Sequence, residues 1–434
     1  MKKLQIPLGL ATIVAGCCVL FMGSSKPSAS QKTVAPIAQL EPKLSPAEIA
    51  LYNEKKQAVE KIVIDYFKEA KAKGDFVGAG IAIVQGDSIM YVDGAGLKSI
   101  SGNDTVNAHT AFRLGSLSKG FAGVLSAAVK QEGLINWDDP VNEYISDFQL
   151  GSIKPSAITI EHILSHSAGT PYHSYTDLVE AGVALSDIAP RFKSVKAITA
   201  PGKTYSYQNA MFALSALVVE KATKSSFDEV IQKRFFKPLG MEDATTNCKD
   251  FQKLGNIAMP HRKTKYSYRS LPINGKYDNA IAAGGINASS TDMAKWMRFL
   301  LGHNPEVLEP QAIQAAFEPK VEIRGKSKYY QRWEGHKSSY YGFGWRIHNF
   351  EDRTTHLAST MIHHGGSVND FRNEIALFPN EDLGICVLFN SNTLLSQRVI
   401  PDLHKLIKES FAKIEANKTT SSMAALKGKE DSNG

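Results

Sequence analysis

The sequence is poor in cysteine, with four in 434 residues. Cys17 and Cys18 lie near its start, which leaves only Cys248 and Cys386 in the body of the chain. Cys386 lies in the apolar run 384–389, which predicts a buried thiol rather than a bridge partner. A chain of this length can bury enough apolar surface to fold without bridges, so we expect no structural disulfide.

A strong charge of one sign is also lacking. The formal net charge is +7, and Lys2, Lys3 and Lys26 supply part of it at the N-terminus. No dense basic block is interleaved with aromatic residues, which argues against a nucleic-acid partner. No internal repeat is visible, and the content of 43% hydrophobic and 21% charged residues is typical of a globular enzyme-sized chain.

The first residues resemble a targeting segment. Met1-Lys2-Lys3 precedes an apolar run over 4–22, which is typical of a secretory signal and also long enough to anchor in a membrane. The stretch 14–17 resembles a lipoprotein cleavage box ending at Cys17. A cleaved signal, a lipid anchor and an uncleaved anchor stay open as alternatives for 1–23. Each predicts an exported protein of the periplasm or cell envelope, tethered by a flexible linker over 24–44.

The pattern of the remaining chain predicts an α/β (α+β) fold over 45–417. A helix to about Lys73 and a hairpin over 79–92 come first, and short strands between 341 and 390 followed by a helix to about Asn417 come last. The economical arrangement joins both ends in one antiparallel sheet flanked by the terminal helices. This sheet lobe would comprise 45–110 and 341–417, and a helical lobe about 111–340. The polar tail 418–434 is expected to be disordered.

One pair of residues suggests catalysis. Ser116 and Lys119 are three residues apart and begin an apolar helical pattern, so both side chains would share one face of a buried helix. A serine hydroxyl needs a base beside it, and burial loosens the proton of a lysine. The spacing alone is weak evidence, because Ser410 and Lys413 repeat it on an ordinary amphipathic segment.

Three ordered motifs give this pair a context: Ser116-Leu117-Ser118-Lys119, Tyr207-Gln208-Asn209 and His364-Gly365-Gly366. In this order, they resemble the serine β-lactamase and penicillin-binding protein superfamily, in particular its class C-like branch with esterases and D-peptidases. The resemblance covers roughly 45–415 and includes the stretches 112–116, 162–169, 238–241, 284–286, 341–345 and 371–379. It implies a β-lactamase/transpeptidase-like fold and an acyl-enzyme serine hydrolase that acts on a small-molecule or peptide substrate without a cofactor.

The resemblance also implies roles for individual residues. Ser116 would attack a carbonyl, and Lys119 would take its proton or keep Tyr207 partly deprotonated. Tyr207 would pass a proton to the leaving group, which we expect to require a nearby positive charge that lowers its pKa. Asn209 would orient Lys119 and a substrate amide. The backbone N–H groups of Ser116 and Ser367 would form the oxyanion hole, beside Gly366.

The third motif departs from the β-lactamase pattern. His364 stands where those enzymes carry lysine, and Gly365 where they carry a hydroxyl residue. A neutral imidazole is a weaker clamp for a carboxylate than lysine. We therefore expect His364 to bind substrate without a requirement for a free carboxylate. The alternative register with His363 fits the same motif shape. No carboxylate or cysteine stands at ligand spacing from these histidines, so we expect no metal site.

Three functions remain open at this point. An amide hydrolase acting on D-amino-acid peptides of the cell wall is the first, and an esterase of the same fold is the second. A protein that binds penicillin or wall fragments without turnover, or assembles with itself, is the third. The complete set of Ser116, Lys119 and Tyr207 favours an enzyme, because a silent protein has no need of all three.

Overall fold

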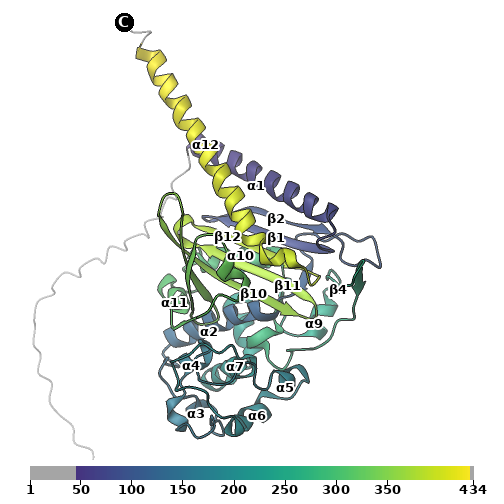
Figure 1. Ribbon diagram of the computed structural model, residues 1–434, viewed down its shortest axis with the longest axis vertical. Coiled ribbons are helices and arrows are strands. Elements are labelled where there is room, and N and C mark those ends of the chain that lie inside the picture. The colour runs from purple at the N-terminus through teal and green to yellow at the C-terminus, as the bar shows by residue number, and fades with distance from the viewer. Residues whose placement is uncertain (1–44, 431–434) are drawn as a thin grey trace, which may run out of the picture. The chain divides into compact units, whose positions relative to one another are not determined.

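The computed structural model describes residues 45–430, with side chains through residue 418. Its centre is an eight-stranded sheet in the order β2-β1-β12-β11-β10-β9-β8-β7, with every neighbouring pair antiparallel (Figure 1). The strands are β1 (Gly78–Gln85), β2 (Ser88–Gly96), β7 (Val321–Glu322), β8 (His336–Tyr341), β9 (Arg346–Glu351), β10 (Ala358–Val368), β11 (Phe371–Phe378) and β12 (Leu383–Phe389). The first and last parts of the fold therefore meet in one sheet, which confirms the predicted fold class.

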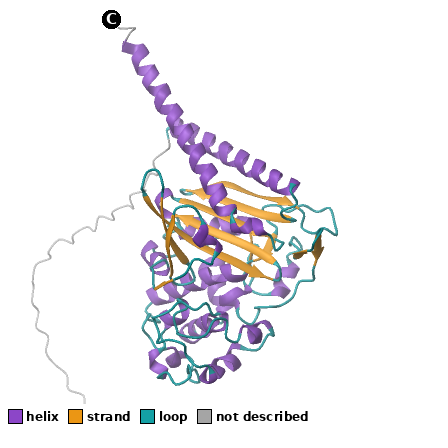
Figure 2. Cartoon of the chain, viewed as in Figure 1, coloured by secondary structure: helices purple, strands orange, loops and turns teal. Residues whose placement is uncertain are grey.

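The terminal helices α1 (Pro46–Ala72) and α12 (Val399–Glu430) cover one face of this sheet (Figures 1 and 2). Their apolar stripes and the inward residues of β1 and β12 form one core, which includes Val59, Phe67, Leu403 and Phe389. Alternate residues along each strand point to this core, while their neighbours point to the opposite face. The same strand can therefore serve two different layers.

The opposite face packs on helices from the middle of the chain. The helices α2 (Ser118–Gln131) and α10 (Ser290–Leu300) lie against the sheet, and the others extend this layer away from it (Figure 2). The remaining helices are α3 (Val141–Tyr144), α4 (Ile160–Leu164), α5 (Thr176–Glu180), α6 (Leu185–Ile188), α7 (Asn209–Thr223), α8 (Phe227–Ile231), α9 (Cys248–Lys253) and α11 (Pro310–Ala316). The middle of the chain also contains two short antiparallel strand pairs. They are β3 (Ala111–Arg113) with β6 (Asn287–Ser289) and β4 (His261–Lys263) with β5 (Tyr268–Ser270).

Glycines let α2 approach the turn between β8 and β9 closely. A methyl group on Gly123 would lie 1.9 Å from the carbonyl oxygen of Phe343, and one on Gly344 would lie 2.0 Å from that of Lys119. Gly344 also has φ +79, a backbone conformation that favours glycine. Larger residues at these positions would force the helix away from the sheet.

Two predicted boundaries were wrong. The later strands were predicted to begin at residue 341, but β7 and β8 begin before it, and residues 342–345 form the turn that joins β8 to β9. The inward positions of β8 are Ser339 and Tyr341 rather than aliphatic residues, so the strand has no hydrophobic alternation to detect. The end of the last helix was also placed too early, because α12 continues to Glu430 past the predicted end near Asn417.

The predicted signal or anchor (1–23) and linker (24–44) lie outside the described residues. Within residues 45–430, no helix combines the length and the apolar character that crossing a bilayer requires.

Candidate active site

Ser116 lies in a 3₁₀ turn (Gly115–Leu117) that leads directly into α2. From Ala111 to Val129, every residue except Ser116 is buried, so this hydroxyl is the accessible point of an otherwise enclosed segment. Lys119 is fully buried on the same face, with its amine nitrogen 3.4 Å from Ser116 Oγ. The pair predicted from the sequence is therefore in contact.

The Lys119 amine has the surroundings of a base rather than of a cation. Burial, and to a lesser extent the charge of Arg346, holds its pKa well below the ordinary value of 10.5. Its nitrogen lies 2.8 Å from Asn209 Oδ1 and 2.7 Å from the carbonyl oxygen of Ala283, and both atoms can only accept hydrogen bonds. A neutral amine that donates its two protons to them keeps one lone pair, and the remaining neighbour is the Ser116 hydroxyl.

Tyr207 approaches the same hydroxyl from just before α7. Its phenol donates a hydrogen bond to Ser116 Oγ at 2.8 Å. Burial raises the pKa of Tyr207 to about 12, although the charge of Arg346 and the bond to Ser116 act in the opposite direction. The charge of Arg346 acts in the expected direction, but desolvation outweighs it and the net shift of the Tyr207 pKa is upward. Tyr207 is thus a neutral proton donor at rest.

Asn209, the first residue of α7, links this group to a loop that sequence reasoning missed. Its Oδ1 accepts from Lys119, and its amide nitrogen donates to the Tyr277 hydroxyl at 3.0 Å. Ala283, in a short π-helix (Ile281–Gly285), supplies the other acceptor for Lys119. Tyr277 begins a second Tyr-x-Asn pattern, which is a signal in the sequence, whereas the carbonyl of Ala283 has none.

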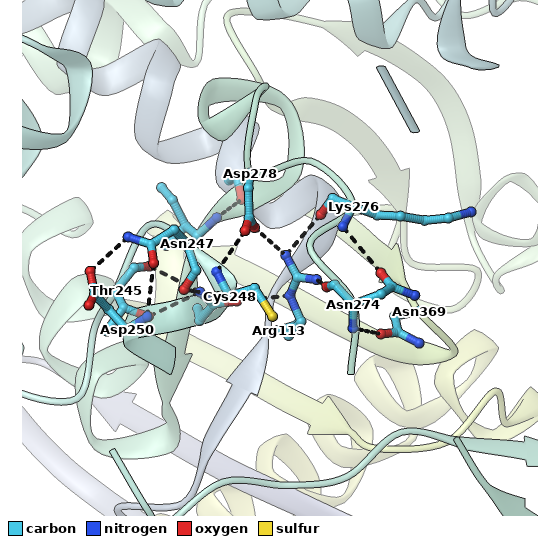
Figure 3. Close-up of polar contacts among 12 residues, drawn as sticks. Arg113, Thr245, Asn247, Cys248, Asp250, Asn274, Lys276, Asp278 and Asn369 are labelled. Carbon is cyan, nitrogen blue, oxygen red and sulfur yellow. Dashed lines mark hydrogen bonds and ion pairs between the residues drawn. The ribbon is translucent and has the colours of Figure 1, made fainter. Parts of the chain in front are cut away.

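The loop that carries Tyr277 is held by a buried arginine. Figure 3 shows the Arg113 guanidinium between Asn274, Lys276 and Asp278. The guanidinium donates to the backbone carbonyl oxygens of Asn274 and Lys276 and lies 3.2 Å from Asp278 Oδ1. The other carboxylate oxygen, Asp278 Oδ2, accepts from the backbone N–H of Cys248 at 3.0 Å. Since Arg113 is fully buried on β3, two residues before the nucleophile turn, it fixes the loop relative to Ser116.

Strand β10 carries the third motif past this group. A methyl group on Gly115 would lie 2.8 Å from the backbone nitrogen of Ser367, and one on Gly366 would lie 2.1 Å from the carbonyl oxygen of Leu114. Gly366 thus permits close contact with the nucleophile turn. On one side, the pairing of β10 with β9 ends at His363. Among the described residues, positions 365–368 of β10 are therefore paired with a strand on the other side only, where β11 lies. The Ser367 side chain is exposed at this position.

His364 is enclosed rather than presented to a ligand. Its Nδ1 lies 2.8 Å from the carbonyl oxygen of Gly365, which can only accept, so Nδ1 carries the proton. Its Nε2 accordingly accepts from the Tyr341 hydroxyl at 2.9 Å, and burial lowers the pKa of the ring well below 6.5. A neutral imidazole with both nitrogens engaged offers no charge to a substrate carboxylate. Its predicted substrate-binding role stays a prediction.

A cavity of about 440 Å³ adjoins Ser367 and Tyr277. Its polar walls include Asn274, Lys276 and Asn369, from the loop held by Arg113 and from the end of β10. Two ion pairs lie in this wall, Lys276 with Glu180 and Arg262 with Asp370, so the lining carries compensated charge. The arrangement suits a polar, amide-rich ligand more than an apolar one.

The opposite face of β10 contains a buried chain of polar side chains. His348 Nε2 lies 3.2 Å from His363 Nδ1, and His363 Nε2 lies 2.8 Å from Glu374 Oε2 on β11. The Tyr329 hydroxyl donates to Glu374 at 2.8 Å. Burial raises the pKa of Glu374 to about 8, so the carboxyl is protonated at neutral pH and the neighbouring ring is neutral.

Replacing Glu374 with glutamine should therefore change how stability depends on pH. The unfolded carboxyl ionises near 4.5 and the folded one near 8, so between these values the wild-type protein loses stability as pH rises. The loss should approach about 1.4 kcal/mol per pH unit from this group alone. Glutamine mimics the protonated carboxyl, so E374Q should match wild type at pH 5 and be more stable at pH 9 in urea unfolding. Parallel pH profiles for the two proteins would contradict this.

Among residues 45–430, no cluster of three or more histidine, cysteine or acidic side chains has an arrangement suited to a metal ion.

Comparison with known proteins agrees with this geometry. The Beta-lactamase family model matches residues 63–407. Unguisins hydrolase ungD' of Aspergillus campestris is 29% identical over 337 residues, which cover 74% of this chain and 59% of that protein's length. Protein flp of Staphylococcus aureus is 23% identical over 364 residues, covering 82% of this chain and 67% of flp. The octameric penicillin-binding protein homologue from Pyrococcus abyssi has the same fold, with TM-score 0.67, 22% identity and coverage of 79% and 76%.

Proposed function

The chain belongs to the beta-lactamase family, and from this premise we propose that it is a hydrolase that forms an acyl-enzyme on Ser116 and cleaves amide or ester bonds. The observation that carries the proposal is the contact of Ser116 Oγ with a phenol at 2.8 Å and with a buried amine at 3.4 Å. A nucleophile, a base with a depressed pKa and a proton donor converge on one accessible oxygen.

The geometry supports the following reaction. The neutral Lys119 amine accepts the proton of Ser116 as Oγ bonds to the substrate carbonyl carbon, and the carbonyl oxygen takes up the negative charge. The phenol of Tyr207 then donates its proton to the leaving nitrogen or oxygen as that bond breaks, and the Lys119 ammonium restores the phenol proton. In the second half of the reaction, a water molecule gives a proton to the same groups and attacks the carbonyl carbon of the acyl-enzyme. The bond to Ser116 Oγ then breaks, Oγ regains its proton, and the acid is released. The chain of proton transfers is short because the Lys119 amine and the Tyr207 hydroxyl both already lie near Ser116 Oγ.

The negative oxygen of the intermediate needs hydrogen-bond donors. The backbone N–H groups of Ser116 and Ser367 are our candidates, because the backbone of Ser367 lies directly against Gly115. Such a pair is typically worth several kcal/mol in the transition state, with one donor contributing about 3–4 kcal/mol. Since both donors belong to the main chain, their positions depend on Gly115 and Gly366 permitting the close approach of β10.

The substrate class that these features favour is an extended peptide. Over 365–368, β10 can accept a further extended segment by main-chain hydrogen bonds, in the manner of strand addition. The adjoining polar cavity suits amide groups. We therefore propose D-amino-acid peptides of the cell wall as substrates of an exported enzyme, with simple esters as the alternative class.

The second candidate function is hydrolysis of substrates that must carry a free carboxylate, and one observation favours it. Arg346, the first residue of β9, pairs with His363 and has buried Nε and Nη1 atoms without a hydrogen-bond partner among the described residues. Its charge acts on both Lys119 and Tyr207. The enclosed His364, in contrast, favours substrates without a carboxylate.

Kinetics on a peptide ending in D-Ala-D-Ala, compared with the same peptide amidated, separate these two candidates. If the neutral His364 is what faces the end of the substrate, we expect the two rates to be within about tenfold of each other, a difference of about 1.4 kcal/mol in the transition state. A preference for the free acid far above that would assign the carboxylate to Arg346. An Arg346→Gln variant should then lose the preference while retaining activity on the amide.

Intact-mass measurement tests the proposed function itself. The protein is incubated with a fluorophosphonate, a penicillin, p-nitrophenyl esters and D-amino-acid peptides, and a covalent adduct on Ser116 is the expected result. Rapid turnover of esters without turnover of peptides would assign the esterase function. A folded protein that gains no mass from any of these compounds would favour a binding protein without turnover.

A further inference from the structure

His166 contacts the segment that carries Tyr207 on both sides of the phenol. It follows α4 and is 2% exposed. Its carbonyl oxygen accepts from the backbone of Ser206 at 2.8 Å, and its Nδ1 accepts from the backbone of Gln208 at 3.2 Å. The two residues that flank Tyr207 are therefore bound to one histidine.

The imidazole ring also packs directly on the phenol. The ring centroids of His166 and Tyr207 are 4.3 Å apart, and His166 lies 4.8 Å from Tyr341 and 5.2 Å from Phe212. Tyr341 in turn donates to His364 on β10. The ring thus fills the space between α7, which follows Tyr207, and the strands beside the cleft.

The state of the ring is fixed by these contacts. An amide N–H can only donate, so Nδ1 is the unprotonated nitrogen and Nε2 carries the proton. Nε2 is buried without a hydrogen-bond partner among the described residues. Burial, followed by the charge of Lys119, lowers the pKa of His166 well below 6.5. The ring is therefore a neutral acceptor and not an acid or base in the reaction.

The backbone at this position is in an uncommon conformation. His166 has φ +58, in the left-handed region that few residues other than glycine and asparagine enter readily. This conformation directs both the carbonyl oxygen and the ring toward the 206–208 segment. A residue that only forms this turn could be glycine or asparagine. A histidine also supplies the Nδ1 acceptor and the ring that packs on Tyr207.

We propose that His166 is a positioning residue that holds the Tyr207 phenol at hydrogen-bond distance from Ser116 Oγ. The proposal rests on the proposed acyl-enzyme function, because its effect is on acylation. His166 makes no hydrogen bond to Ser116 among the described residues, and the proposed effect on catalysis is transmitted through Tyr207. Its loss should slow proton transfer without removing the nucleophile.

Two substitutions that tolerate the backbone separate the contributions. His166→Gly accepts φ +58 but removes the acceptor and the ring. His166→Asn also accepts this conformation, and its Oδ1 can take the place of Nδ1. The second-order rate of labelling by a phenyl phosphonate ester, whose leaving phenoxide must take up the Tyr207 proton, should fall about tenfold to a hundredfold in H166G, as expected for a misplaced catalytic group. H166N should recover most of that loss. His356→Gly, at an exposed left-handed histidine between β9 and β10, is the matched control and should label at the wild-type rate.

A double-mutant cycle with Tyr207→Phe distinguishes positioning from a merely structural role. If His166 acts through the phenol, H166G should cost nothing further in the Y207F background. Equal losses in both backgrounds, or wild-type labelling by H166G, would overturn the assignment while the proposed function stands. A wild-type protein that is never labelled would overturn both. Thermal unfolding and circular dichroism of each variant confirm that the compared proteins are folded.

Discussion

Replacing Ser116 with alanine is expected to abolish covalent labelling and reduce turnover by about 10⁴-fold or more, as removal of the nucleophile does in other serine hydrolases. No other described group can take the place of Oγ, because Lys119 and Tyr207 converge on this one atom. The hydroxyl is small and partly exposed, so its loss should leave the free energy of unfolding nearly unchanged. Intact-mass labelling and urea unfolding of the same preparation measure both quantities.

The chain supplies a matched control for this variant. Ser410 and Lys413 repeat the Ser-x-x-Lys spacing on α12, on the other side of the sheet from α2. Ser410→Ala should label at the wild-type rate. Labelling that survives in S116A, or disappears in S410A, would contradict the assignment of the nucleophile.

Replacing Lys119 with arginine should lower the labelling rate by about 10²- to 10⁴-fold, the usual contribution of a general base. Arginine retains a long cationic side chain and its donors but cannot release its proton at any accessible pH. The variant therefore separates a base from a fixed positive charge. A Lys119→Arg enzyme that keeps more than about a tenth of the wild-type rate would show that the charge, and not the lone pair, is what Ser116 needs. Lys413→Arg on α12 is the control.

The wild-type pH profile should carry the same signature. Burial lowers the pKa of Lys119, so the amine becomes an active base well below pH 10.5, and the rate should rise as that proton is lost. The phenol of Tyr207, with its pKa near 12, remains a proton donor over this range. For stability, the unfolded chain binds this lysine proton more readily than the folded one, so folding gains from Lys119 as pH rises toward 10.5.

Much of this fold could be predicted, and the reasons are visible in particular elements. The helix at Pro46–Ala72 begins at a serine-proline cap, and the first hairpin has its turn at Gly86. Apolar strands such as Leu383–Phe389 are fully buried, and their apolar composition alone predicts them. Fold class and family were predicted correctly from such signals and from the ordered motifs. β8 escaped prediction because its inward side chains form polar contacts instead of an apolar stripe.

The site was less predictable than the fold. Spacing suggested Ser116 and Lys119, and the family resemblance added Tyr207 and Asn209. The structure brings all four together, and their catalytic roles stay predictions. The electrostatics could not be read in advance, because the pKa of Tyr207 depends on how deeply the phenol is buried. Arg346 and the carbonyl of Ala283 come from distant segments, and neither has a motif. His364 matched a motif position, but its enclosure by Tyr341 follows only from the packing.

The close approach of Gly123 and Gly344 has a consequence for protein engineering. Helix α2 has no room to shift against the β8–β9 turn, so the reacting groups form a fixed platform. The loop around Tyr277, by contrast, is joined to the platform by hydrogen bonds of side chains such as Arg113 and Asn209, and it lines the neighbouring cavity. Libraries that aim to broaden the substrate range should therefore diversify Asn274 and Lys276 and leave the glycines of the platform untouched.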